Sequence, residues 1–194
     1  MSLSYKEIQL GGGVIKPVHY HIGEWYAINH FISQSMVTDV ATKVLDLGCG
    51  IGYGVGMFNK LGYKRVLGVD INDKKIEIGQ ELGYNVICED FMKLQRTNFD
   101  VIWSSHSFEH MENPNLAIEK LIEISRDTAN FYFILPYPDL DPAPAHCSSK
   151  EIGLSVDDNA ITLVRWFESK GLRLLSRKFD KFREPEVWLK FDKR

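Results

Sequence analysis

Short apolar runs alternate with segments of helical periodicity from residue 43 onward, and this alternation is the main structural signal of the chain. Five runs of mainly apolar residues predict strands, at residues 44–47, 65–70, 85–88, 99–104 and 131–135. Apolar residues at helical spacing predict helices between and after them, at residues 55–61, 73–82, 115–125 and 157–170. Near-continuous apolar strands separated by helices are typical of a parallel sheet that helices cover on both faces.

The pattern changes after the last of these helices. Two further strands are predicted at residues 172–179 and 186–191, with only a short turn between them. A parallel crossover needs a dozen or more residues, so this short link favours an antiparallel hairpin. The expected fold class is therefore α/β: a doubly wound, mostly parallel seven-stranded sheet with a C-terminal antiparallel hairpin.

Residues 1–42 precede this pattern and lack strand-like runs. Trp25, Ile28 and Ile32 lie near helical spacing within an aromatic stretch, and the three glycines at 11–13 indicate a flexible joint. We expect residues 1–42 to form an N-terminal helical cap or lid on a domain formed by residues 43–194. The alternative is a helix that simply packs on the sheet.

The composition fits one hydrophobic core and gives no overall basic field. The 194 residues are 44% hydrophobic, and the formal net charge of -3 gives no overall attraction to nucleic acid. A basic group at Lys178, Lys181 and Arg183 is expected to form a solvated face. No run approaches the roughly 20 apolar residues of a membrane span. Three cysteines without an apolar signal segment indicate free thiols and a cytoplasmic protein, whose oligomeric state the sequence does not indicate.

An acid and three glycines follow the first predicted strand and form the most informative motif of the chain. The order is Asp-x-Gly-x-Gly-x-Gly, from Asp46 to Gly52. A dinucleotide site needs Gly-x-Gly-x-x-Gly, and Tyr53 or Val55 would stand at the third glycine in either register. A glycine-rich turn after a buried strand brings backbone N–H groups close to a ligand, and this spacing opposes a dinucleotide.

At this motif the chain resembles the class I S-adenosylmethionine-dependent methyltransferases. The resemblance implies their Rossmann-like fold, S-adenosyl-L-methionine as methyl donor and S-adenosyl-L-homocysteine as product. The cofactor-binding residues that we expect are Asp46, Gly48, Cys49, Gly50, Gly52, Asp70, Ile71, Asp90, Phe91, Ser104 and Ser105.

Two of these acids follow the second and third predicted strands, where ligands of open α/β sheets bind. Asp70 is expected to accept hydrogen bonds from ribose hydroxyls. It could instead cap the next helix, although Asn72 and Asp73 are available for that role. Asp90, beside Phe91, is expected near the adenine amino group, with Glu89 as the rival acid.

The fourth strand and its exit carry a second resemblance, to small-molecule, type-11-like methyltransferases. The matching elements are Phe99-Asp100-Val101-Ile102 and Glu109-His110. His106 lies between them, at the end of the strand where donor and acceptor should meet, and is the first candidate for a catalytic base. His146, in a long proline-rich connection, is the second.

Two other features of this region are expected to carry no chemistry of their own. Glu109-His110 is expected to orient the loop at a helix start rather than to act in catalysis. His146 and Cys147 do not recur at metal-ligand spacing, so no metal site is expected.

These observations favour an S-adenosylmethionine-dependent methyltransferase acting on a small-molecule oxygen or nitrogen acceptor. Neither nucleic acid nor a membrane is expected as a partner. The first alternative is a regulatory module that binds the cofactor without turnover. The second is an NAD-dependent or nucleotide-sugar enzyme, which the glycine spacing opposes.

Overall fold

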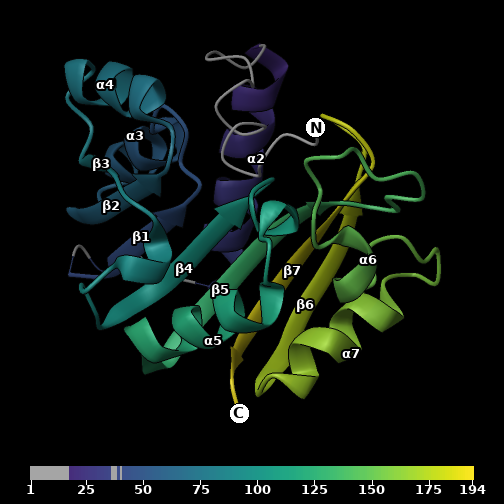
Figure 1. The fold of residues 1–194 in the computed structure, drawn as a ribbon. Helices are drawn as coiled ribbons and strands as arrows, with labels where there is room; N and C mark the ends of the chain where they lie inside the picture. Colours follow the sequence, from purple (N-terminus) through teal and green to yellow (C-terminus); the bar gives the residue numbers. More distant parts are fainter. Residues whose placement is uncertain (1–17, 36–38, 40) are drawn as a thin grey trace.

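The computed structural model describes residues 18–35, 39 and 41–194, and the predicted joint at 11–13 lies outside them. Its seven strands form one sheet in the order β3-β2-β1-β4-β5-β7-β6 (Figure 1). The strands are β1 (Lys43–Leu47), β2 (Arg65–Asp70), β3 (Val86–Cys88), β4 (Phe99–Ser105), β5 (Ser125–Pro136), β6 (Leu172–Asp180) and β7 (Glu186–Lys193). The first five are parallel and β7 is antiparallel to both neighbours, which confirms the predicted fold class.

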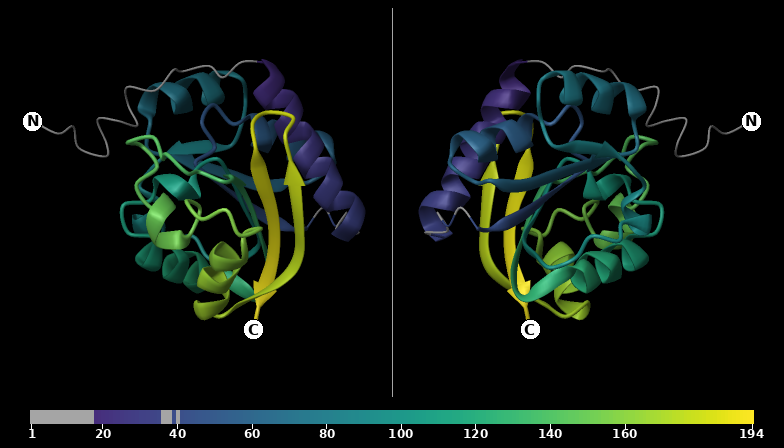
Figure 2. Two further views of the ribbon diagram at one scale, coloured as in Figure 1. Left: turned by 90° about the vertical axis from the view of Figure 1, so that its right-hand side faces the viewer. Right: turned by 90° about the vertical axis from the view of Figure 1, so that its left-hand side faces the viewer.

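Helices cover both faces of this sheet. The α-helices are α2 (Val18–Ser35), α3 (Tyr53–Lys60), α4 (Asp73–Glu81), α5 (Pro114–Ile124), α6 (Ser149–Ile152) and α7 (Ile161–Ser169), and the 3-10 helices are η1 (Phe91–Lys93) and η2 (Phe108–His110). Figure 2 shows α2 on one side of the β6–β7 hairpin and α7 on the other. None of the helices in the described part of the chain is both long and apolar enough to cross a membrane.

Alternation along the strands divides the core between the two faces. Phe131 and Phe133 of β5 belong to the cluster that includes α5 and α7, whereas Tyr132 and Ile134 belong to the cluster that includes α2 and α3. Successive side chains of a strand point to opposite faces, so a central strand that is buried on both faces is apolar at most of its positions. This explains why the apolar runs of the sequence located the strands.

Two elements begin four or more residues away from their predicted start. Strand β5 begins at Ser125 rather than 131, because its first residues extend past the helices into solvent and include exposed polar side chains, such as Arg126 and Asp127. Helix α7 begins at Ile161 rather than 157, since Asn159 and Ala160 take positive φ angles of 59°. Polar residues in a strand, and a left-handed turn before a helix, leave no apolar periodicity to detect.

Candidate functional site

A cavity of about 890 Å³ opens at the edge of the sheet where β1, β2 and β4 end. Parallel strands bring their carboxyl ends to the same edge, so residues that follow different strands meet there. The expected site residues that line the cavity are Asp46, Gly48, Cys49, Gly50, Asp70, Ile71, Asp90, Phe91, Ser105 and His106. Gly52, Ser104 and His146 are not among its lining residues.

The glycine loop between β1 and α3 runs in a left-handed conformation. Gly48, Gly50 and Gly52 have φ angles of 67°, 56° and 84°, which side chains other than glycine rarely adopt. A Cβ atom on Gly48 would lie 2.4 Å from the Cβ of Ser107, and one on Gly52 would lie 2.8 Å from a methyl group of Val86. Gly52 therefore permits close packing behind the loop, while Gly48 and Gly50 line the cavity.

Asp70 joins the glycine loop to the loop after β2. One carboxylate oxygen accepts a hydrogen bond from the Gly50 N–H at 2.9 Å, and the other accepts one from the Asn72 N–H, also at 2.9 Å. Asn72 caps α4, because its side chain accepts from the Lys75 N–H. Asp70 does not cap α4, and it lines the cavity.

Asp46 is a buried acid beneath the glycine loop. Only 4% of the surface of Asp46 is exposed. Burial raises the pKa of Asp46 well above its usual value, the charges of Glu24 and Asp70 raise it further, and a backbone hydrogen bond from Val55 opposes them. Three carboxylates near one loop favour a cationic or hydrogen-donating ligand.

The turn after β3 brings acids and an apolar side chain to the cavity. Asp90 caps η1 by accepting from the Met92 N–H at 3.0 Å, and Glu89 also lines the cavity. The Phe91 side chain belongs to the hydrophobic core, with its residue only 6% exposed. Met92 is 38% exposed and lines the same cavity, so it is a further apolar group available to a ring.

The two serines at the end of β4 have different surroundings. Ser104 is fully buried, with its hydroxyl 2.7 Å from that of Ser107, which donates to the Leu47 carbonyl. Ser104 therefore joins the ends of β4 and β1 behind the cavity wall. Ser105 faces the cavity and donates to a carboxylate oxygen of Glu24 at 2.6 Å.

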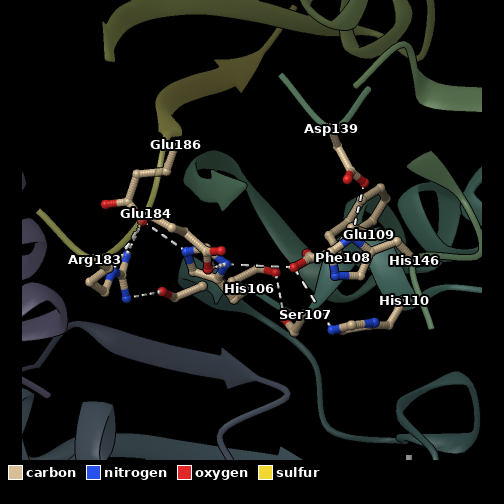
Figure 3. Close-up of polar contacts among 12 residues, drawn as sticks. His106, Ser107, Phe108, Glu109, His110, Asp139, His146, Arg183, Glu184 and Glu186 are labelled. Atoms are coloured by element: carbon tan, nitrogen blue, oxygen red, sulfur yellow. Dashed lines mark hydrogen bonds and ion pairs between the residues drawn. The ribbon is translucent and has the colours of Figure 1, made fainter. Parts of the chain in front are cut away.

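His106 lies among three carboxylates (Figure 3). Its Nε2 is 2.8 Å from Glu186 Oε2, and its Nδ1 is 3.3 Å from Glu184 Oε1 and 3.8 Å from Glu109 Oε1. The residue has a φ of 49°, an uncommon angle outside glycine that is often found at functional sites. Both ring nitrogens of His106 therefore face carboxylate oxygens.

A buried ion network connects His106 to the two ends of the chain. Arg183 Nη1 donates to Glu24 Oε2 at 3.0 Å, and its Nε donates to Glu186 Oε2 at 3.1 Å. Burial would raise the pKa of Glu186, but the His106 hydrogen bond, the Arg183 and His106 charges and a hydrogen bond from Trp188 together lower it. The expectation that Arg183 lies on a solvated face is wrong, since its side chain is only 2% exposed.

Sequence reasoning missed Glu24, Arg183 and Glu186 as site residues because they belong to no motif. They come from α2 and from the turn and strand after β6, more than 75 residues away from β4 in either direction. The available signal was weak: a charged cluster in the turn between two apolar strands. Such a cluster is more often exposed than buried.

The second predicted base, His146, lies beside the cavity rather than on its wall. Its Nδ1 is 2.9 Å from Asp139 Oδ2, and its ring centre is 5.0 Å from that of His110. Of the two expected catalytic histidines, only His106 faces the cavity.

A known family of methyltransferase domains matches residues 45–133, from β1 to the middle of β5. Residues 45–133 therefore carry a methyltransferase domain of the class I S-adenosylmethionine-dependent kind. The chain is similar in sequence to cycloartenol-C-24-methyltransferase 1 of Oryza sativa subsp. japonica, with 30% identity over 95 residues. The alignment covers 44% of this chain and 28% of that protein. The chain spans about a third or less of the length of the curated relatives it matches.

Two solved structures show how widely this methyltransferase fold is shared. The magnesium protoporphyrin IX methyltransferase of Synechocystis PCC 6803, with bound cofactor, superposes with a TM-score of 0.70 at 13% identity, covering 100% of this chain and 99% of that chain. The [4+2]-cyclase SpnF superposes with a TM-score of 0.69 at 14% identity, covering 87% and 80%. At such identities the likeness concerns the fold alone.

Proposed function

We propose that this methyltransferase binds S-adenosylmethionine in the cavity and transfers its methyl group to an oxygen or nitrogen atom of a small molecule, releasing S-adenosylhomocysteine. One observation carries the proposal: a single cavity is lined both by the glycine loop with Asp70 and by His106. This shared lining supports donor and acceptor sites that lie next to each other, as an in-line displacement requires.

The residues on one side of the cavity fit the donor. Two cavity-lining glycines, Gly48 and Gly50, leave room for close approach, and no atom lies within 4 Å of where a Cβ atom on Gly50 would be. We assign Asp70 to the ribose hydroxyls and Asp90 or Glu89 to the adenine amino group. Met92 is the exposed apolar side chain available to the adenine ring. When bound, the sulfonium supplies an electrophilic methyl group.

The residues on the other side fit an acceptor that must lose a proton. A lone pair on the acceptor forms the new bond to the methyl carbon, the sulfur keeps the electrons of the broken bond, and the acceptor proton passes to the His106 imidazole. The Glu186 carboxylate, 2.8 Å from His106 Nε2, orients the imidazole. The relatives named for a porphyrin and a sterol substrate support a small-molecule acceptor.

Calorimetry tests the donor half of the proposal. We expect micromolar binding of S-adenosylmethionine and S-adenosylhomocysteine and none of NAD. Asp70→Ala should weaken binding by about a hundred-fold or more, since it removes charge-assisted hydrogen bonds. Asp73→Ala, an exposed acid on the next helix, is the matched control and should bind normally. Binding of NAD alone would overturn the assignment.

A methyl-transfer screen over small hydroxyl, amine and carboxyl acceptors tests the acceptor half. Since a [4+2]-cyclase shares the fold, the readout is a labelled methyl group on the product. We expect His106→Ala to lower turnover by about 10²–10⁴-fold with cofactor binding retained. Undiminished turnover would remove His106 from the reaction, and cofactor binding without product from any acceptor would favour the regulatory module.

A further inference from the structure

A second polar cluster lies beside the cavity, where η2 meets the connection of residues 137–148. Glu109, His110 and His146 each offer one donor atom, and these atoms all lie within 4.8 Å of one another. The Glu109 side chain is 1% exposed, and the two imidazoles are 21% and 22% exposed. We propose that this cluster binds one divalent cation of the zinc class, with these three side chains as its ligands.

The hydrogen bonds of the two histidines orient them as metal ligands. His110 Nδ1 is 2.7 Å from the Ala145 carbonyl oxygen, and His146 Nδ1 is 2.9 Å from Asp139 Oδ2. A carbonyl and a carboxylate only accept, so each Nδ1 carries a hydrogen and each Nε2 can present a lone pair. A ligating histidine usually has its other nitrogen held in this way.

Glu109 has the position of a third ligand. Its Oε1 is 3.8 Å from His110 Nε2, which is too long for a hydrogen bond. Two ligands of one tetrahedral zinc ion lie about 3.4 Å apart, given zinc–ligand distances of about 2.1 Å. A small inward movement of the three side chains would therefore complete the site around a cation.

The surrounding backbone holds the ligands in register. The Ser148 N–H donates to the Glu109 carbonyl at 3.0 Å, and the Ser148 hydroxyl donates to the Phe108 carbonyl at 3.2 Å. The Ser149 hydroxyl donates to Asp139 at 2.6 Å, which fixes the carboxylate that orients His146. The connection is thus attached to η2 before any cation binds, so little ordering is needed on binding.

The chemistry of the three ligands selects the class of cation. Two imidazoles and one carboxylate suit zinc and similar transition metals, whereas magnesium and calcium prefer oxygen ligands throughout. Three protein ligands leave at least one coordination position for water. Because Glu109 Oε1 is also 3.8 Å from His106 Nδ1, the cation would hold this carboxylate next to the proposed base (Figure 3).

Titration of the chelator-treated full chain with zinc chloride tests the site, with neither cofactor nor acceptor present, so that the result is independent of methyl transfer. We expect one zinc ion per chain at micromolar or tighter affinity. His110→Ala and His146→Ala should each weaken binding by at least a hundred-fold, and Asp139→Asn by about 10–100-fold. His19→Ala, an exposed histidine on α2, is the control and should bind zinc normally.

Cobalt chloride provides a second readout that a general loss of structure would not imitate. The unmodified chain and His19→Ala should show the visible absorption bands of bound cobalt. His146→Ala should lack these bands although its circular dichroism spectrum is unchanged. Retention of one tightly bound zinc ion by both ligand variants, or absence of stoichiometric binding by the unmodified chain, would overturn the proposal. The cluster would then serve only to attach the connection of residues 137–148 to η2.

Discussion

At the scale of single residues, Asp46 is a buried acid whose charge has a cost in stability. Its carboxyl is buried beside Glu24 and Asp70, and burial together with these charges holds its pKa well above the usual value. A raised pKa in the folded state means that the folded chain binds the proton more tightly than the unfolded chain. The acid therefore costs stability as the pH rises above about 4, the usual range for an aspartate.

We expect Asp46→Asn to be more stable than the unmodified chain at neutral pH. The neutral side chain can still accept the Val55 N–H, and it removes the cost of a buried charge. At pH 8 the melting temperature should rise by about 2–4 °C, the shift that 1 kcal/mol produces in a chain of this size. The gain should shrink toward pH 4, which thermal unfolding at several pH values would measure.

The exposed Asp73 provides the comparison, since Asp73→Asn should leave the pH dependence almost unchanged. If Asp46→Asn were equally destabilised at pH 4 and pH 8, the carboxylate would be stabilising in a way that its surroundings do not explain. We also expect Asp46→Asn to bind S-adenosylmethionine more weakly, because stability and function often conflict at such sites.

At the scale of elements, one acid adds polar contacts to the apolar packing of α2. Glu24 accepts from Trp103 Nε1 at 2.5 Å, from the Ser105 hydroxyl at 2.6 Å and from Arg183. A single carboxylate thus joins α2 to β4 and to the turn before β7. Tyr20, His21 and Glu24 also line the cavity. That α2 acts as a lid stays a prediction.

We expect Glu24→Ala to lower the free energy of unfolding by about 2–3 kcal/mol, because it leaves the Trp103 and Ser105 donors without their acceptor. Urea unfolding would measure this loss, and hydrogen exchange should accelerate most within α2. Glu77→Ala, an exposed acid on α4, is the control and should change stability little.

The same variant separates a lid from a helix that only packs on the sheet. If α2 is a lid, Glu24→Ala should weaken S-adenosylmethionine binding by more than the lower stability of the variant accounts for. Unchanged affinity in a folded but less stable Glu24→Ala would indicate that α2 only packs on the sheet.

At the scale of the whole molecule, the C-terminal hairpin completes the core of the sheet. Strand β7 pairs with β5 from Asn130 to Pro136, and Trp188 of β7 is fully buried against the face covered by α2 and α3. The family similarity ends at residue 133, well before this hairpin. Without β6 and β7, strand β5 would become an open edge beside an uncovered apolar surface.

We expect a chain that ends at Gly171 to lack a cooperative unfolding transition, because the hairpin covers buried side chains of both core clusters. Circular dichroism and thermal unfolding would measure this. Trp188→Ala in the full chain is the graded comparison and should cost about 3–5 kcal/mol while the fold is kept. A truncated chain that unfolds cooperatively near the melting temperature of the full chain would contradict this view of the hairpin.

The sequence by itself determined the fold class and identified the glycine loop and Asp70, which line the cavity. Apolar runs mark strands buried on both faces, and the Asp-x-Gly-x-Gly-x-Gly order constrains the backbone of a single loop, so both are properties of neighbouring residues. Asp70 could be found in the same way, because it ends a strand and an adjacent asparagine is available as the helix cap. Such features depend only on residues that are neighbours in the sequence, so they can be recognised without knowledge of distant contacts.

Only the tertiary structure decided the surroundings of His106 and the meeting of Glu109, His110 and His146. Glu24 and Glu186 reach the site from opposite ends of the chain, and His146 approaches His110 from 36 residues away. The sequence indicated no metal site, because these ligands have no regular spacing. Their proximity results from strand order and from the path of one long connection, which bring together residues whose separation along the chain carries no signal.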